Sequence, residues 1–239
     1  MQAKVYGVPG ERSRTVGTLK VVLPVLAALF FTGAVAGVGA AMLAPKISAV
    51  VFLCLAIVAA VFLLWTAHLC PSRIEAFFKG ARGEERTAFA LENLPEGFCV
   101  FHGLARGKGL AGLARGDMDH VVAGRTGVFV VETKCWEGEV MCDRGRIWVE
   151  GRLPTRDPLA QVLKAREELE SALAEKDGAV KVRAVLCFAG RGFTGGRANI
   201  NGVEVCHVRE VAGLVEKSDE VALTREEVGV VADKLVRML

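Results

Sequence analysis

Two long apolar segments near the N-terminus constrain this chain more than any other feature. Residues 21–45 and 47–72 contain no Asp, Glu, Lys or Arg, and only Lys46 separates them. Each run exceeds the roughly 20 apolar residues that cross a bilayer core as a helix, and the about 7–15 of a signal peptide. We therefore expect a two-helix transmembrane hairpin over residues 21–72. The alternative, a hydrophobic hairpin buried in a soluble core, needs an unusually large domain around it.

The charges divide the chain at the same place. Residues 1–72 hold five Lys and Arg against one Glu, and the rest of the chain holds 25 Lys and Arg against 26 Asp and Glu. The formal net charge of +3 therefore belongs to the apolar end and indicates no basic nucleic-acid surface elsewhere. Because basic residues flank the outer ends of the hairpin, the positive-inside rule places both termini in the cytoplasm, at the cell (inner) membrane.

The expected organisation follows from these two divisions. Residues 1–20 form a cytoplasmic tail, residues 73–83 a juxtamembrane linker, and residues 84–239 a single domain. Gly33, Gly37 and Gly39 permit close helix packing, so the expected partners are the lipid bilayer and a homo-oligomer formed through the hairpin. The seven cysteines include no C-x-x-C pair, which argues against a disulfide framework or a zinc knuckle.

Strand and helix patterns alternate along residues 84–239, which predicts an α/β fold with a mixed sheet flanked by helices. The expected strands cover residues 98–104, 119–124, 127–134, 146–150, 180–190 and 203–208. The expected helices cover residues 84–94, 158–176, 209–217 and 224–239. A glycine-rich loop over 105–116 and a two-residue turn at Arg125 and Thr126 connect the early strands.

Charged residues stand at the end of one of these apolar strands. Glu132 and Lys134 are two residues apart, so both share a face with Val128 and Val130. Asp119, on the preceding strand, could bring a second carboxylate near Glu132. Two carboxylates suit a hard cation such as Mg²⁺ or Mn²⁺, and a lysine beside them could stabilise negative charge on a phosphodiester. A solvated ion pair of little consequence is the alternative, since Glu-x-Lys is a common triplet.

Four segments in order resemble the NERD, or nuclease-related, domain over about residues 79–190. They are KGARGEE (79–85), DMDHVVAG (117–124), GVFVVETKCWEGEV (127–140) and DPLAQ (157–161). This resemblance implies a restriction-endonuclease-like core of the PD-(D/E)xK superfamily. It also implies that Asp119 and Glu132 are metal ligands, that Lys134 is the catalytic lysine, and that Glu84 and Gln161 complete the catalytic set.

Several other features are weaker candidates for function. The run from Gly107 to Gly112 matches G-x-G-x-x-G, but no convincing helix follows it, which argues against dinucleotide binding. His120 points away from the Asp119 face, and His102 and His207 lack metal-ligand spacing. Asp117 could be an outer group of the site or a loop cap. We expect residues 190–202, with Arg191 and Arg197, to be a solvated connection more readily than a phosphate-binding loop.

The leading hypothesis is a membrane-anchored, Mg²⁺-dependent nuclease that hydrolyses DNA or RNA. A non-catalytic, membrane-tethered module that binds nucleic acid or protein is the alternative, and the near-neutral charge of residues 73–239 favours it slightly. A transporter subunit is weaker still, because neither apolar run contains an ionisable Asp, Glu, Lys or Arg.

Overall fold

The computed structural model describes residues 2–42, 49–106, 116–174, 180–217 and 223–239. The chain divides into two compact units. One unit comprises Met1–Glu11 together with Lys79–Leu239, and the other comprises Arg12–Phe78. The loop around Lys46 and most of the glycine-rich loop lie outside the described residues.

Both apolar runs are helical over the residues that the structure describes. Helix α1 spans Glu11–Met42 and helix α2 spans Ala49–Glu92. Across the described part of the chain, no helix combines the length and the apolarity that crossing a membrane requires. The structure therefore does not support the predicted transmembrane hairpin, nor lipid and oligomer contacts made through it.

A seven-stranded mixed sheet forms the centre of the larger unit, in the order β1-β2-β3-β4-β7-β9-β8. Its strands are β1 (Lys4–Tyr6), β2 (Cys99–Ala105), β3 (Asp117–Gly124), β4 (Gly127–Lys134), β7 (Val182–Phe188), β8 (Ala198–Ile200) and β9 (Val203–His207). Strands β2, β3 and β4 are antiparallel neighbours, whereas β4, β7 and β9 are parallel. This arrangement confirms the predicted mixed α/β fold.

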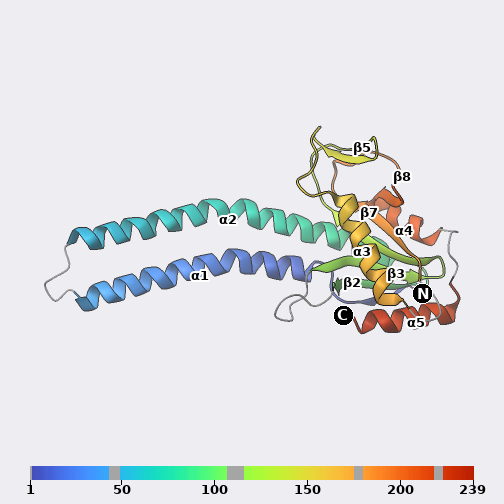
Figure 1. Cartoon of the computed structure of the whole chain (residues 1–239), viewed down its shortest axis with the longest axis horizontal. Helices are drawn as coiled ribbons and strands as arrows, with labels where there is room; N and C mark the ends of the chain where they lie inside the picture. The colour runs from blue at the N-terminus through green and yellow to red at the C-terminus, as the bar shows by residue number, and fades with distance from the viewer. Residues whose placement is uncertain (1, 43–48, 107–115, 175–179, 218–222) are drawn as a thin grey trace. The chain divides into compact units, whose positions relative to one another are not determined.

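Helices cover both faces of this sheet. Helices α3 (Pro158–Leu173) and α5 (Arg225–Val236) contribute to one core, and Figure 1 shows α3 lying across the strands. The C-terminal end of α2 and helix α4 (Val208–Glu216) contribute to the other core. Val162 of α3 packs in the core that contains Val130, while Leu91 of α2 packs in the core that contains Phe129. Because side chains alternate along β4, successive residues pack against helices on opposite faces of the sheet.

The N-terminal residues differ from the expected tail. Lys4–Tyr6 form β1, which pairs in parallel with β2 and places Val5 opposite Val100. The backbone N–H of Ala3 also donates to the carbonyl oxygen of Leu94, at 2.9 Å. Three residues are too few to show a period, and the partner strand lies more than 90 positions away. Sequence patterning therefore could not reveal this strand.

Three further details depart from the sequence expectations. The expected linker over residues 73–83 is helical and belongs to α2. Strand β5 (Val140–Asp143) was not expected, and it pairs with β6 (Arg146–Val149) in a separate two-stranded sheet. Strand β8 lies in the segment 190–202, which we expected to be a solvated connection. Each of these strands has only three or four residues, so pairing defines it more than residue alternation does.

Candidate active site

Strand β4 changes from apolar to charged along one face. Val128 and Val130 are buried in the core beneath α3, and Glu132 and Lys134 follow them at the same spacing. Glu132 is only 3% exposed. The antiparallel register pairs His120 with Val131, so the next position along β3 sets Asp119 opposite Glu132. Alternation therefore gathers two carboxylates and one ammonium group at this end of the sheet.

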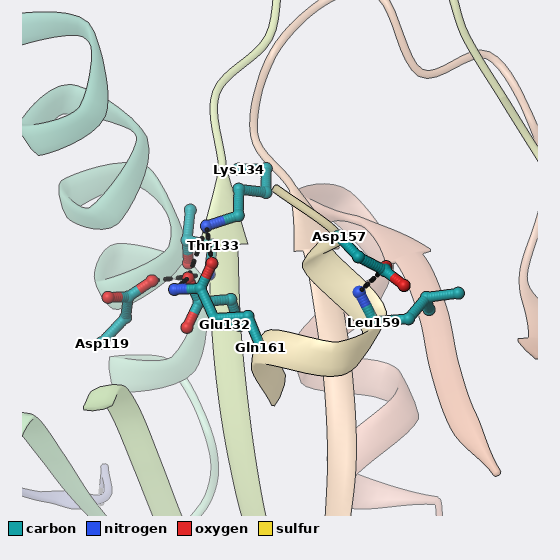
Figure 2. A network of polar contacts seen from close by, with 7 residues as sticks. All are labelled: Asp119, Glu132, Thr133, Lys134, Asp157, Leu159 and Gln161. Carbon is teal, nitrogen blue, oxygen red and sulfur yellow. Dashed lines mark hydrogen bonds and ion pairs between the residues drawn. The ribbon is translucent and has the colours of Figure 1, made fainter. Parts of the chain in front are cut away.

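Glu132, Lys134 and Gln161 form a closed set of polar contacts (Figure 2). The Nζ of Lys134 donates to Oε1 of Glu132 at 2.5 Å and to Oε1 of Gln161 at 3.0 Å. The Nε2 of Gln161 donates to the same Glu132 oxygen at 2.5 Å. These contacts satisfy one carboxylate oxygen of a buried glutamate and fix the direction of the lysine.

Asp119 lies beside this set and is held by the backbone. Its Oδ2 accepts a hydrogen bond from the N–H of Thr133 at 2.7 Å (Figure 2). Burial raises the pKa of Asp119 well above its ordinary value, and the negative charges of Glu132 and Glu84 raise it further. Lys134 and the Thr133 N–H act in the opposite direction but do not cancel this effect. Three carboxylates therefore share a region with one lysine.

Helix α3 presents Gln161 to the site from its first turn. The helix begins at an N-cap, where Oδ1 of Asp157 accepts the N–H of Leu159 at 2.9 Å. Pro158 occupies the first helical position, where the missing N–H costs nothing. The positive end of the helix dipole also lies toward the carboxylates, because Gln161 contacts Glu132. The cap fixes where α3 starts and thereby which residue reaches the lysine.

The donor set suits a hard divalent cation with few protein ligands. Asp119 and Glu132 supply carboxylate oxygens, and a cation would offset the negative charge of Glu132 and Glu84, which adds to the effect of burial on the pKa of Asp119. Within the described ranges, no group of three or more His, Cys, Asp or Glu side chains could hold a metal ion. Two carboxylates suit an ion such as Mg²⁺, which usually keeps several of its water ligands.

The structure brings together the residues that the sequence selected for the site. Glu132, Lys134 and Gln161 touch one another, and Glu132 and Glu84 both act on the charge of Asp119. Asp117, the outer candidate, begins β3. The catalytic and metal-binding roles of these residues stay predictions.

Sequence reasoning missed two contributions to the site. The backbone N–H of Thr133 donates to Asp119. Almost every residue has such a donor, so the residue type at position 133 could not reveal this contact. The Asp157 cap had a signal, because an Asp-Pro pair before an apolar helix is typical of a helix start.

The histidines lie away from the site. His102 and His120 are buried together on the opposite face of the sheet, with their Nδ1 atoms 2.8 Å apart. One Nδ1 must donate and the other accept, and His102 Nε2 also lies 3.3 Å from Oε1 of Glu92. His207 caps α4 by accepting the N–H of Arg209 at 3.2 Å. None of these three histidines contributes a contact to Glu132, Lys134 or Gln161 among the hydrogen bonds of the described residues.

Comparison with known proteins supports the family resemblance. The family model of the nuclease-related domain (NERD) matches residues 79–189, which agrees with the expected extent of 79–190. The match includes all five of the selected residues, from Glu84 to Gln161. No curated protein and no solved structure matches the chain significantly.

Proposed function

We propose that the nuclease-related domain hydrolyses phosphodiester bonds of DNA or RNA in a reaction that depends on a divalent metal ion. The observation that carries this proposal is the closed set of contacts among Glu132, Lys134 and Gln161, with Asp119 beside it. A lysine held by a carboxylate and an amide, next to a second carboxylate, combines cation binding with charge stabilisation in one place.

Each residue has a distinct part in the proposed reaction. Asp119 and Glu132 would hold Mg²⁺ or Mn²⁺, which supplies Lewis acidity and lowers the pKa of a bound water. Lys134 would stabilise the negative charge that grows on the phosphate oxygens as water attacks phosphorus and the ester P–O bond breaks. Gln161 positions Lys134 through its Oε1, and Glu84 adds negative potential that favours a cation near Asp119.

A cleavage assay with the purified full-length chain tests this proposal. The full chain is needed because β1 comes from residues 4–6. Labelled single-stranded and duplex DNA and RNA are incubated with EDTA, Mg²⁺ or Mn²⁺. We expect cleavage only with metal, and its loss in Glu132→Gln. The matched control is Glu96→Gln, which changes an exposed glutamate in the turn before β2 and should cleave normally. Cleavage that persists in Glu132→Gln would contradict the assigned site.

A non-catalytic nucleic-acid-binding module is the second candidate. The observation that favours it is that Lys134 already donates to both Glu132 and Gln161. The same assay separates the two proposals, because a binding module would retain nucleic acid without cutting it in any metal. Such a module would also bind Mg²⁺ no more weakly when Glu132 is changed to glutamine.

We further propose attachment to the inner membrane with both termini in the cytoplasm. This proposal comes from the uncharged runs 21–45 and 47–72 and their basic flanks. The exposed Leu23, Phe30 and Phe31 of α1 are in keeping with an apolar environment. Fractionation of cells that express the full chain tests it, since alkaline carbonate should leave the protein in the membrane pellet. Complete release into the supernatant would contradict attachment.

A further inference from the structure

We propose that a groove between α2 and α4 binds a single strand of nucleic acid next to the active site. This inference rests on the proposed function and names the form of substrate that the site receives. The groove has a volume of about 420 Å³. Its main lining residues are Arg82, Glu85, Arg86 and Phe89 of α2, with Val208 and Arg209 of α4.

The groove gathers positive charge on a domain whose net charge is close to zero. Three guanidinium groups, of Arg82, Arg86 and Arg209, line it against one carboxylate, of Glu85. Arg82 and Arg86 are one helical turn apart, about 6 Å along the axis. All three arginines are exposed, although Arg86 also donates from Nη1 to the carbonyl oxygen of Ala189 at 3.1 Å. Guanidinium groups in a row suit successive phosphates of one backbone.

Phe89 determines which form of nucleic acid the groove fits. Its side chain is 72% exposed in the middle of this basic lining. An exposed phenyl ring among arginines provides a stacking surface for a base, and such stacking is tolerant of sequence. A base inside a duplex is already stacked on both sides and cannot cover the ring. The combination of phosphate-binding groups and a free aromatic face therefore favours a single strand.

One turn of α2 connects the groove to the active site. Gly83 follows Arg82 and packs against Cys135, so closely that a Cβ on Gly83 would lie 2.6 Å from that of Cys135. Cys135 is the residue after Lys134. Glu84, on the same turn, adds to the negative potential at Asp119. A strand bound along Arg86 and Arg82 is therefore led toward the end of β4, where Lys134 lies.

A binding titration tests the groove independently of catalysis. The full-length chain carrying Glu132→Gln is used in EDTA, so that the probe stays intact. Fluorescence anisotropy follows labelled oligo-dT, oligo-U and a mixed-sequence duplex over a range of salt concentrations. Further substitutions are then added one at a time: Phe89→Ala, Phe89→Trp, Arg82→Gln and Arg209→Gln. Arg144→Gln is the matched control, since its side chain is 91% exposed on the β5–β6 turn, outside the groove.

The expected effects differ between the aromatic and the basic residues. Phe89→Ala should weaken binding of oligo-dT and oligo-U by about 5- to 100-fold, with an unchanged salt dependence, and Phe89→Trp should retain it. Arg82→Gln and Arg209→Gln should each reduce the slope of log K against log salt by about 0.7. Arg144→Gln should change neither quantity.

Three further outcomes separate this inference from the proposed function. If the chain binds single strands but no groove substitution weakens binding, the groove is wrong and the proposed function survives. Duplex binding that exceeds single-strand binding and ignores Phe89→Ala also overturns the groove. If no nucleic acid binds in EDTA, the groove is wrong, and the cleavage assay with Mg²⁺ or Mn²⁺ decides the proposed function separately.

Discussion

On one face of β3 and β4 lie Asp119, Glu132 and Lys134, and on the other lies His120, paired with His102 of β2. Asp119 and His120 are consecutive in the chain, so alternation alone separates the two groups. The histidine pair is sealed in the core, with each residue at most 1% exposed. The Lys134 side chain keeps 19% of its surface exposed. Lys134 thus reaches solvent in part, whereas both histidines lie wholly in the core.

The two faces also differ in how their polar atoms are satisfied. The histidines share one hydrogen bond through their Nδ1 atoms, and His102 Nε2 also lies 3.3 Å from Oε1 of Glu92. His120 Nε2 is buried without a hydrogen-bond partner. The charged face instead keeps like charges close, and burial together with Glu132 and Glu84 raises the pKa of Asp119. A buried carboxylate held near like charges at a strand end is typical of a functional site, whereas the paired histidines pack in the core.

The largest expected effect is on the cleavage rate, which should depend on the charged face and not on the histidine face. Lys134→Gln should slow metal-dependent cleavage by about 100- to 1,000-fold, because it removes the ammonium group that faces the growing phosphate charge. His102→Gln should leave the cleavage rate within about threefold of the wild type, since its contacts lie on the other face. Single-turnover rates of the full-length chain at saturating Mg²⁺ check both. Equal losses in the two variants would contradict the division.

The next effect concerns stability and should be confined to the histidine face. His102→Ala removes a buried ring and leaves Nδ1 of His120 without its hydrogen bond. We expect the free energy of unfolding to fall by about 2–3 kcal/mol. Urea denaturation measures it, with His207→Ala as the control, because His207 is partly exposed. A loss at His102 no larger than at His207 would show that the buried pair does not stabilise the core.

The two faces should respond to pH in opposite directions. Burial lowers the pKa of His102 and His120 below 6.5. Below that pH the unfolded chain therefore binds protons that the folded protein does not bind. Stability should therefore fall as pH drops below about 6.5, with a slope of up to about 1.4 kcal/mol per pH unit for each histidine. Asp119 has a raised pKa, so the folded protein keeps a proton that the unfolded chain releases above pH 3.8. Its contribution should fall as pH rises.

Unfolding curves in EDTA between pH 4 and 8 check these signs. His102→Gln combined with His120→Gln should flatten the loss of stability on the acid side. Asp119→Asn should raise stability at neutral pH by about 1 kcal/mol, as removal of a strained functional group commonly does. A destabilised Asp119→Asn variant would mean that the hydrogen bond from Thr133 outweighs the repulsion.

The smallest effect tests how α3 supports the charged face. Asp157→Ala removes the cap that accepts the Leu159 N–H and should lower stability by about 1 kcal/mol. Because Gln161 lies in the first turn, the cleavage rate should also fall, by less than in Lys134→Gln. Asp157→Asn, which keeps a capping oxygen, should restore both quantities. An unchanged rate in Asp157→Ala would show that Gln161 does not depend on the cap.

Local patterns predicted much of this site, and long-range contacts account for what they missed. Alternation placed Glu132 and Lys134 together, and the two-residue turn set Asp119 on the neighbouring strand. Nothing local connects Gln161 or Glu84 to that strand, and only the family resemblance selected them. The basic groove shows the same limit, because Arg82, Arg86 and Phe89 follow helical spacing, whereas Arg209 joins them from α4, more than 100 residues away.

Calorimetric titration of Mg²⁺ into the full-length chain tests most directly whether the charged face is the metal-dependent site. We expect a binding heat in the wild type that is lost in Asp119→Asn and in Glu132→Gln, and retained in His102→Gln. Binding that is identical in the wild type and Asp119→Asn would contradict it.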